Sequence, residues 1–139
     1  MKRFSVILGL GLWAAAGAVH ADVIPACAVP TGAMMIGFDQ LPTAVRKALA
    51  KQTGAMAMPG QPFNATDAVT KPLPFSRGIF VWSRGTRWVI ATEHGGIAYN
   101  DPIYVFDAVS DHKRVALTAT RTATPATVCA TAQDLLNTQ

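Results

Sequence analysis

Apolar and polar residues alternate through the second half of the chain, with the period of two that is typical of half-buried strands. Four segments carry this pattern, and we expect each to be a strand: "RGIFVWS" (77–83), "TRWVIATEH" (86–94), "PIYVFDA" (102–108) and "KRVALTATRT" (113–122). The residues Arg84, Gly85 and Thr86 form a tight hairpin signal between the first two. Consecutive strands with such short connections predict a four-stranded antiparallel meander. A fifth apolar segment, "AMMIGF" (33–38), is a candidate for a short edge strand.

Helical spacing occurs once on each side of this region. The segment 42–53 starts with Pro42, ends before Gly54, and spaces its apolar residues as one helix face does. A second helix is expected after Thr124 and Pro125, a capping residue followed by proline. We expect the N-terminal and the C-terminal helix to pack on one face of the meander, which gives an α+β fold. The other face then stays exposed, or the Pro-rich connection 55–76 covers it.

The N-terminal stretch has the pattern of an export signal. Lys2 and Arg3 precede the uncharged apolar segment 4–19, and the sequence Ala-Val-His-Ala that follows predicts cleavage after Ala21. We therefore expect residues 1–21 to be a signal peptide and 22–139 to be a single small α+β domain, periplasmic or secreted. No later segment is long and apolar enough for a transmembrane helix. A lipoprotein is the alternative, but Cys27 lies too far beyond the apolar segment for lipid attachment.

Two cysteines remain in the expected mature chain, Cys27 near its start and Cys129 near its end. In an oxidising compartment such a pair is expected to form a disulfide. The wide spacing indicates a structural cross-link between the two ends of the domain, because catalytic disulfide exchange commonly uses closely spaced cysteines.

The charge balance makes nucleic acid an unsuitable partner. The chain has 12 basic and 8 acidic residues, and loss of Lys2 and Arg3 leaves 10 against 8, a net charge of +2. A nucleic-acid surface requires a denser basic face. The sequence also contains no G-x-S-x-G, H-E-x-x-H, phosphate-loop or dinucleotide motif, so we expect no cofactor and no metal.

The segment "TEHGGIAYNDP" (92–102) holds the residues from which a catalytic site could be built: Glu93, His94 and Asp101. Adjacent strand residues point to opposite faces, so Glu93 and His94 should diverge. In a meander His94 and His112 lie about 15 Å apart, one strand length, and cannot share a metal. A small periplasmic hydrolase or metal-assisted enzyme centred on His94, with Glu93 and Asp101, is thus the alternative hypothesis and not the leading one.

The leading hypothesis is an exported, non-enzymatic binding module. Aromatic and arginine residues, the types enriched at interface anchors, exceed what one face of a small meander requires. The expected contact residues are Tyr99, Asn100 and Asp101 in the loop and Trp82, Arg84 and Arg87 on the sheet. The target is another envelope protein or a cell-wall component. In general plan the chain resembles bacterial envelope inhibitors and immunity proteins, and this resemblance implies an inhibitor or immunity-type role. A purely structural envelope protein is a third alternative.

Overall fold

The computed structural model describes residues 26–109 and 113–138. The expected signal peptide, its cleavage position at Ala21, and His112 lie outside this part of the chain. The elements are β1 (Met34–Ile36), the 3-10 helix η1 (Phe38–Gln40), α1 (Thr43–Thr53), β2 (Met56–Ala57), β3 (Ser76–Arg84), β4 (Arg87–His94), β5 (Asp101–Val109), β6 (Arg114–Ala123) and α2 (Val128–Asn137). No helix in these two ranges is long and apolar enough to cross a membrane.

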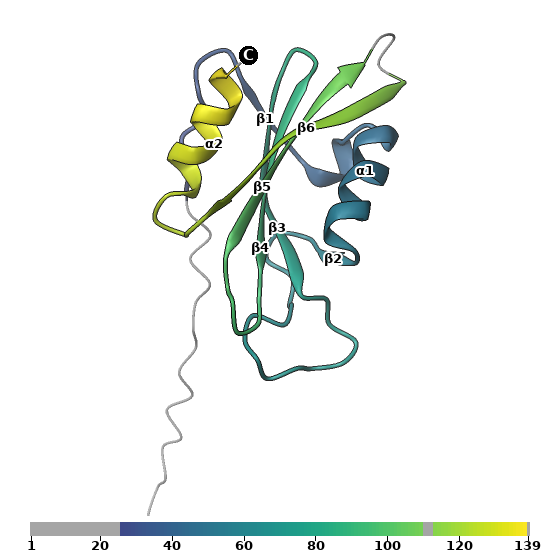
Figure 1. Ribbon diagram of the computed structural model, residues 1–139, viewed down its shortest axis with the longest axis vertical. Helices are drawn as coiled ribbons and strands as arrows, with labels where there is room; N and C mark the ends of the chain where they lie inside the picture. The colour runs from purple at the N-terminus through teal and green to yellow at the C-terminus, as the bar shows by residue number, and fades with distance from the viewer. Residues whose placement is uncertain (1–25, 110–112, 139) are drawn as a thin grey trace, which may run out of the picture.

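The strands form one sheet in the order β1-β3-β4-β5-β6, and β2 pairs with β3 beyond the end of β1 (Figure 1). The four predicted strands correspond to β3, β4, β5 and β6, each antiparallel to the next, so the predicted α+β class and meander are confirmed. The predicted number of four strands is corrected to six. The additional strands are β1, which the apolar segment 33–38 had suggested, and β2, whose two residues are too few to show a periodic pattern.

The prediction that both helices pack on one face is wrong. Helix α2 covers one face of the sheet and α1 lies on the other (Figure 1). The α2-face core includes Phe80, Trp82, Val89, Ala91, Ile103, Val105, Val128, Ala132 and Leu136. The α1-face core includes Phe38, Leu41, Val45, Leu49, Val81, Trp88, Ile90 and Phe106. Because β3 and β4 are apolar at successive positions, both of their faces need cover, and neither face is left open for binding.

The side chain of Phe38 in η1 packs against β3 at Gly78, a position without a side chain. A Cβ atom at Gly78 would lie 2.5 Å from Cζ of the Phe38 ring. Real Cβ contacts are longer than this, so the lack of a side chain at position 78 is what lets the ring approach the strand. The pairing of β3 with β4 also shifts between Gly78 and Phe80, which indicates a β-bulge at Ile79.

The C-terminal helix is held at both ends. The predicted disulfide joins Cys27 to Cys129 in its first turn and closes a sequence separation of 102 residues. At the other end, Arg87 binds Asp107 through two hydrogen bonds of 2.7 and 2.9 Å and also donates to the carbonyl oxygens of Leu135 and Thr138. Carbonyls at a helix C-terminus lack partners within the helix, so the arginine satisfies them.

Candidate functional site

The β4–β5 turn, residues 95–100, closes one end of the sheet. It is clamped at its base by His94 and Asn100, whose backbones exchange hydrogen bonds of 2.8 and 3.1 Å. The Asn100 side chain stays within the turn, since its amide donates to the carbonyl of Ala98 at 2.6 Å. The turn therefore has a fixed base and a fixed C-terminal half.

A second loop, residues 61–75, supports the turn from the side. Gly95 donates to the carbonyl of Phe75 at 2.9 Å, and Gly96 to that of Ala65 at 3.3 Å. A Cβ atom at Gly95 would overlap the carbonyl oxygen of Asn64, so the two backbones approach as closely as glycine permits. Gly96 has φ of 99°, a conformation that side-chain-bearing residues rarely adopt. Gly95 thus permits the close approach of the two loops, and Gly96 permits the positive φ of the turn.

Asn64 organises this supporting loop. Its side-chain amide donates to the carbonyl of Leu73 at 2.6 Å, and its Oδ1 accepts from the backbone of Thr70 at 2.7 Å. Its own backbone donates to Pro74 at 2.8 Å. The asparagine is buried, and its hydrogen bonds replace those that a strand or helix would supply to a long irregular loop. The two loops form one braced unit.

Behind the turn, three charged side chains lie in a row across β3, β4 and β5, which we call the charged row: Arg77, Glu93 and Asp101. Arg77 pairs with Glu93 across the strands, and the register that pairs Ala91 with Ile103 and His94 with Asn100 places Glu93 opposite Asp101. All three are buried, at 4, 5 and 1% exposure. Alternation puts the row on the α2 face, since Glu93 follows Ala91 by two positions.

Glu93 is well supplied with partners. Arg77 donates to its Oε1 at 2.5 Å, and the Tyr99 hydroxyl donates to its Oε2 at 2.6 Å. Arg77 in turn lies over the Phe63 ring, with Cζ 4.3 Å from the ring centroid, and donates to the carbonyl of Gln61 at 3.2 Å. The charged row therefore ties the sheet to both loops, and the phenol of Tyr99 fixes the turn to the core.

Asp101 is in a different situation. Its Oδ1 atom is buried and has no hydrogen-bond partner among the described residues. Burial, and to a smaller extent the neighbouring charge of Glu93, raises the pKa of Asp101 from 3.8 to about 6. A carboxyl group in this position is protonated more easily than any ordinary aspartate. At 1% exposure it does not meet solvent in this conformation.

His94 does not join these carboxyl groups. It lies on the face opposite to Glu93, as adjacent strand positions predict, and its side chain is exposed. Its Nδ1 is 3.1 Å from the hydroxyl of Ser76, and its ring centroid lies 6.4 Å from that of Phe75. The alternative catalytic trio is thus divided: Glu93 and Asp101 face each other inside the protein, whereas His94 lies outside.

The expected contact residues on the sheet have structural partners. Trp82 is buried in the α2-face core and stacks on Phe80 at a centroid distance of 4.5 Å, which replaces the expectation of a surface position. Arg84 donates to Asn137 at 2.9 Å and to the carbonyl of Thr31 at 2.8 Å. Together with Arg87, it fastens the end of α2 and the N-terminal segment to the hairpin.

The two loops carry three exposed apolar residues at this end of the sheet, and we call them the apolar tip: Phe75, Ile97 and Tyr99. Ile97 is 94% exposed, and Phe75 and Tyr99 are 40 and 42% exposed. No sequence pattern points to Ile97, because a single apolar residue in a glycine-containing turn belongs to no periodic series. Only the bracing of the turn shows that this side chain is held away from the core.

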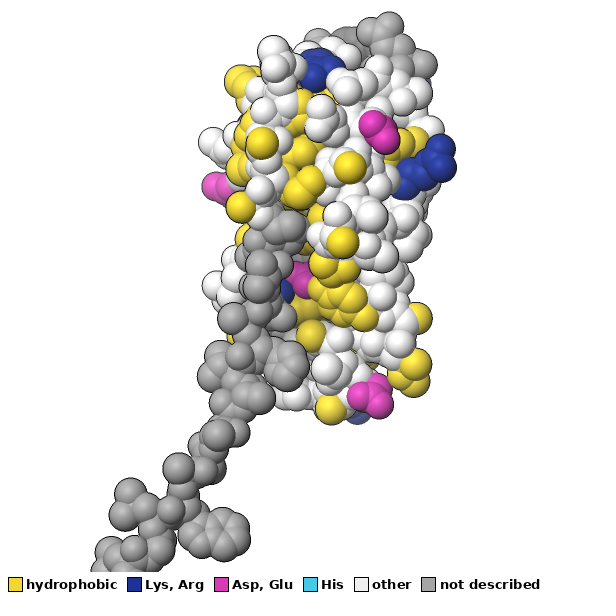
Figure 2. Space-filling model, turned by 90° about the vertical axis from the view of Figure 1, so that its left-hand side faces the viewer, with side chains coloured by type: hydrophobic (Ala, Val, Ile, Leu, Met, Phe, Trp, Pro, Cys, Tyr) yellow, Lys and Arg dark blue, Asp and Glu magenta, His cyan; other side chains and the backbone are white. Residues whose placement is uncertain are grey.

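On the side that carries α2, Lys and Arg occur at scattered positions while hydrophobic side chains lie in view (Figure 2). In residues 26–109 and 113–138, no three His, Cys, Asp or Glu side chains are grouped as metal ligands. Comparison of the chain with protein-family models, curated proteins and solved structures finds no match, so the site alone carries the functional argument.

Proposed function

We propose that the protein is an exported binding module that engages another protein of the cell envelope through its apolar tip. The observation that carries this proposal is the 94% exposure of Ile97 on a turn that is braced by a second loop. An aliphatic side chain gains nothing from this position in the isolated molecule. Covering it with a partner removes apolar surface from water.

The bracing matters because binding costs less when the contact surface is already ordered. The turn is held by the backbone bonds between His94 and Asn100, by the two glycines, and by the bond from Tyr99 to Glu93. A rigid loop loses little conformational entropy on association. Binding residues commonly lie on loops that a rigid scaffold positions.

The chemistry of the tip favours a protein over a cell-wall component. Aliphatic and aromatic groups together form the desolvated centre of protein interfaces, with polar groups around them. Asp101, expected in this contact surface, is buried and takes no part in it. The Asn100 side-chain amide is bonded within the turn. The proposed contact residues of this loop region are therefore Ile97 and Phe75, together with Tyr99, in place of Asn100 and Asp101.

Export is part of the proposal and rests on the sequence of the N-terminal stretch. The disulfide between Cys27 and Cys129 is compatible with a secreted or periplasmic protein, because such bonds persist in oxidising compartments. An inhibitor or immunity-type role would follow if the partner were an envelope enzyme or toxin.

The enzymatic alternative, a hydrolase or metal-assisted enzyme centred on His94, has one supporting observation: Asp101 carries a raised pKa beside Glu93. Raised carboxyl pKa values occur at catalytic acids. Here, however, the carboxyl is buried and His94 lies on the other face of the sheet. The geometry therefore favours binding over catalysis.

A capture experiment with two matched variants tests the proposal. The wild-type protein, Ile97→Asp and Leu117→Asp are immobilised and exposed to an envelope extract. Leu117 is an exposed apolar residue on β6, remote in sequence from both loops. We expect one partner to be retained in stoichiometric amount by the wild type and by Leu117→Asp, and lost from Ile97→Asp at an unchanged melting temperature. Equal retention by all three proteins would exclude the apolar tip.

A further inference from the structure

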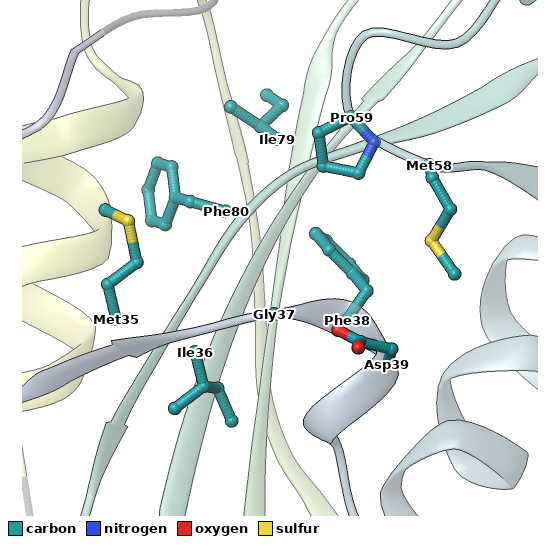
Figure 3. Close-up of a pocket in the computed structure, with 9 residues that line it drawn as sticks. All are labelled: Met35, Ile36, Gly37, Phe38, Asp39, Met58, Pro59, Ile79 and Phe80. Carbon is teal, nitrogen blue, oxygen red and sulfur yellow. The ribbon is translucent and has the colours of Figure 1, made fainter.

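An open apolar groove lies at the edge of the sheet formed by β1 and β3, and we call it the methionine groove. Its first cavity has a volume of about 470 Å³ and is lined mainly by Met35, Ile36, Phe38, Met58, Ile79 and Phe80 (Figure 3). A second cavity of about 200 Å³ adjoins it towards α1 and shares Phe38 and Met58. Pockets for small molecules commonly measure about 300–1,000 Å³.

The groove exists because β3 lacks a neighbouring strand over part of its length. β1 pairs only with Val81–Ser83 of β3, and β2 only with Ser76–Arg77. The stretch between them, Gly78 to Phe80, has no strand beside it on this edge among the described residues. Two short strands thus leave an apolar opening that one longer strand would have closed. The opening is three residues long and offers an inserted peptide few backbone hydrogen bonds, which favours a small ligand.

The walls are exposed and adaptable. Met35 and Met58 are 51 and 48% exposed, although most of what surrounds them is apolar. Methionine has a flexible, polarisable side chain and is over-used at surfaces that bind apolar ligands of variable shape. A ligand in the groove would cover both side chains and fill the space between them.

Arg46 of α1 lines the second cavity. Its side chain makes one hydrogen bond to a described residue, a long one of 3.4 Å to the hydroxyl of Thr43, and no described carboxylate lies within ion-pair distance of it. The single acidic residue of the first cavity, Asp39, disfavours an anion there. The two cavities therefore differ in charge. The first cavity suits the apolar part of a ligand, and the second suits a negative head group beside Arg46.

We propose that the methionine groove binds a single-chain anionic amphiphile, a long-chain carboxylate whose tail occupies the first cavity and whose head group pairs with Arg46. This site lies on different elements from the apolar tip and does not depend on the function proposed for it. Ile97→Asp should leave ligand binding in the groove unchanged, so the two proposals fail or succeed separately.

Calorimetric titration of the purified, disulfide-bonded protein tests this site. The probes are palmitate below its micelle concentration, hexadecanol as a neutral analogue and cetyltrimethylammonium as a cationic one. We expect one palmitate per chain, with weaker binding of hexadecanol and of the cation. The proposal is overturned if the folded wild type does not bind palmitate, or if either analogue binds more tightly than palmitate does.

Three variants assign the binding to the groove. Met58→Asp places a charge in the wall and should lower the affinity for palmitate by more than about tenfold. Arg46→Ala should lower it by about tenfold and leave hexadecanol unaffected, because only the carboxylate uses the guanidinium. Lys47→Ala, on the same helix but outside the lining, is the control and should bind as the wild type does. Wild-type affinity in Met58→Asp and Arg46→Ala would contradict the assignment.

Discussion

Glu93 and Asp101 face each other across β4 and β5 inside the protein, yet only the Glu93 carboxylate has hydrogen-bond partners for both of its oxygens. Glu93 accepts hydrogen bonds from Arg77 and Tyr99, whereas Oδ1 of Asp101 has no partner among the described residues. An isolated buried carboxylate is costly, and the proton is the simplest means of removing its charge. The pair therefore makes the stability of this end of the sheet dependent on pH.

The first prediction concerns that dependence. The pKa of Asp101 is about 6 in the folded protein and near the ordinary 3.8 in the unfolded chain. A raised folded pKa stabilises the protein fully at low pH, and this contribution is lost as the pH rises from about 4 through about 6. Since one pKa unit corresponds to about 1.4 kcal/mol, the loss should be about 3 kcal/mol.

Denaturant titration of the wild type and of Asp101→Asn at several pH values measures this effect. The amide cannot ionise, so the difference in unfolding free energy between the two proteins should change in favour of the variant across that window. The ion pair of Asp107 with Arg87 acts in the opposite sense and at lower pH, because that pair lowers the pKa of Asp107. It is present in both proteins and cancels. A pH-independent difference would show that Asp101 is not buried as described.

The second prediction separates the two glycines of the β4–β5 turn. Gly95→Ala should destabilise the protein by more than about 2 kcal/mol, because the new methyl group would overlap the backbone of Asn64. Gly96→Ala meets open space and bears only the cost of its positive φ, about 1 kcal/mol. Thermal unfolding of both variants gives the order. The reverse order would mean that the two loops do not pack as closely as the structure shows.

The third prediction concerns Gly78 and Phe38. Gly78→Ala should cost about 1–3 kcal/mol, because its methyl group pushes the Phe38 ring away from β3. In the background of Phe38→Leu, whose side chain is smaller at this contact, the same substitution should cost clearly less. A double-mutant cycle of unfolding free energies measures the coupling. Additive effects would show that the ring and the glycine do not touch.

The fourth prediction concerns the disulfide. Replacing both Cys27 and Cys129 by serine opens a loop of 102 residues. The chain-entropy model gives a loss of about 4–5 kcal/mol for a loop of this length, and measured losses are often smaller. The unfolding free energy of the double serine variant should therefore fall by at least about 2 kcal/mol. Reduction of the wild type with a thiol should reproduce this value, and a stability equal to that of the oxidised protein would contradict it.

The sequence predicts elements whose signals are local and repeated. Alternation identifies β3 to β6, helical spacing identifies α1 and α2, and two cysteines leave one possible disulfide pairing. Alternation alone does not place the helices, because apolar residues at successive positions, such as Val81 and Trp82, are buried on both faces of the sheet. Periodicity indicates that a face is apolar, but it does not indicate which element covers that face.

The candidate site depended on features that have no sequence period. Asp101 belongs to a turn signal, Asn-Asp-Pro, and such residues are normally exposed. Its burial depends on tertiary packing, and the nearby loop 61–75 is likewise organised by Asn64, through bonds to residues nine and six positions away. The methionine groove likewise results from the lengths of β1 and β2, which no residue pattern encodes. Long irregular segments were thus the part of the structure that could not be predicted.

Site-specific photo-crosslinking tests the proposed function most directly. A benzophenone amino acid is placed at position 97 or, as the control, at position 117, and intact cells that produce the full-length protein are irradiated. We predict a single discrete adduct from position 97 that is absent from position 117 and that involves an envelope protein. No adduct from position 97, or the same adducts from both positions, would contradict a role of the apolar tip in binding.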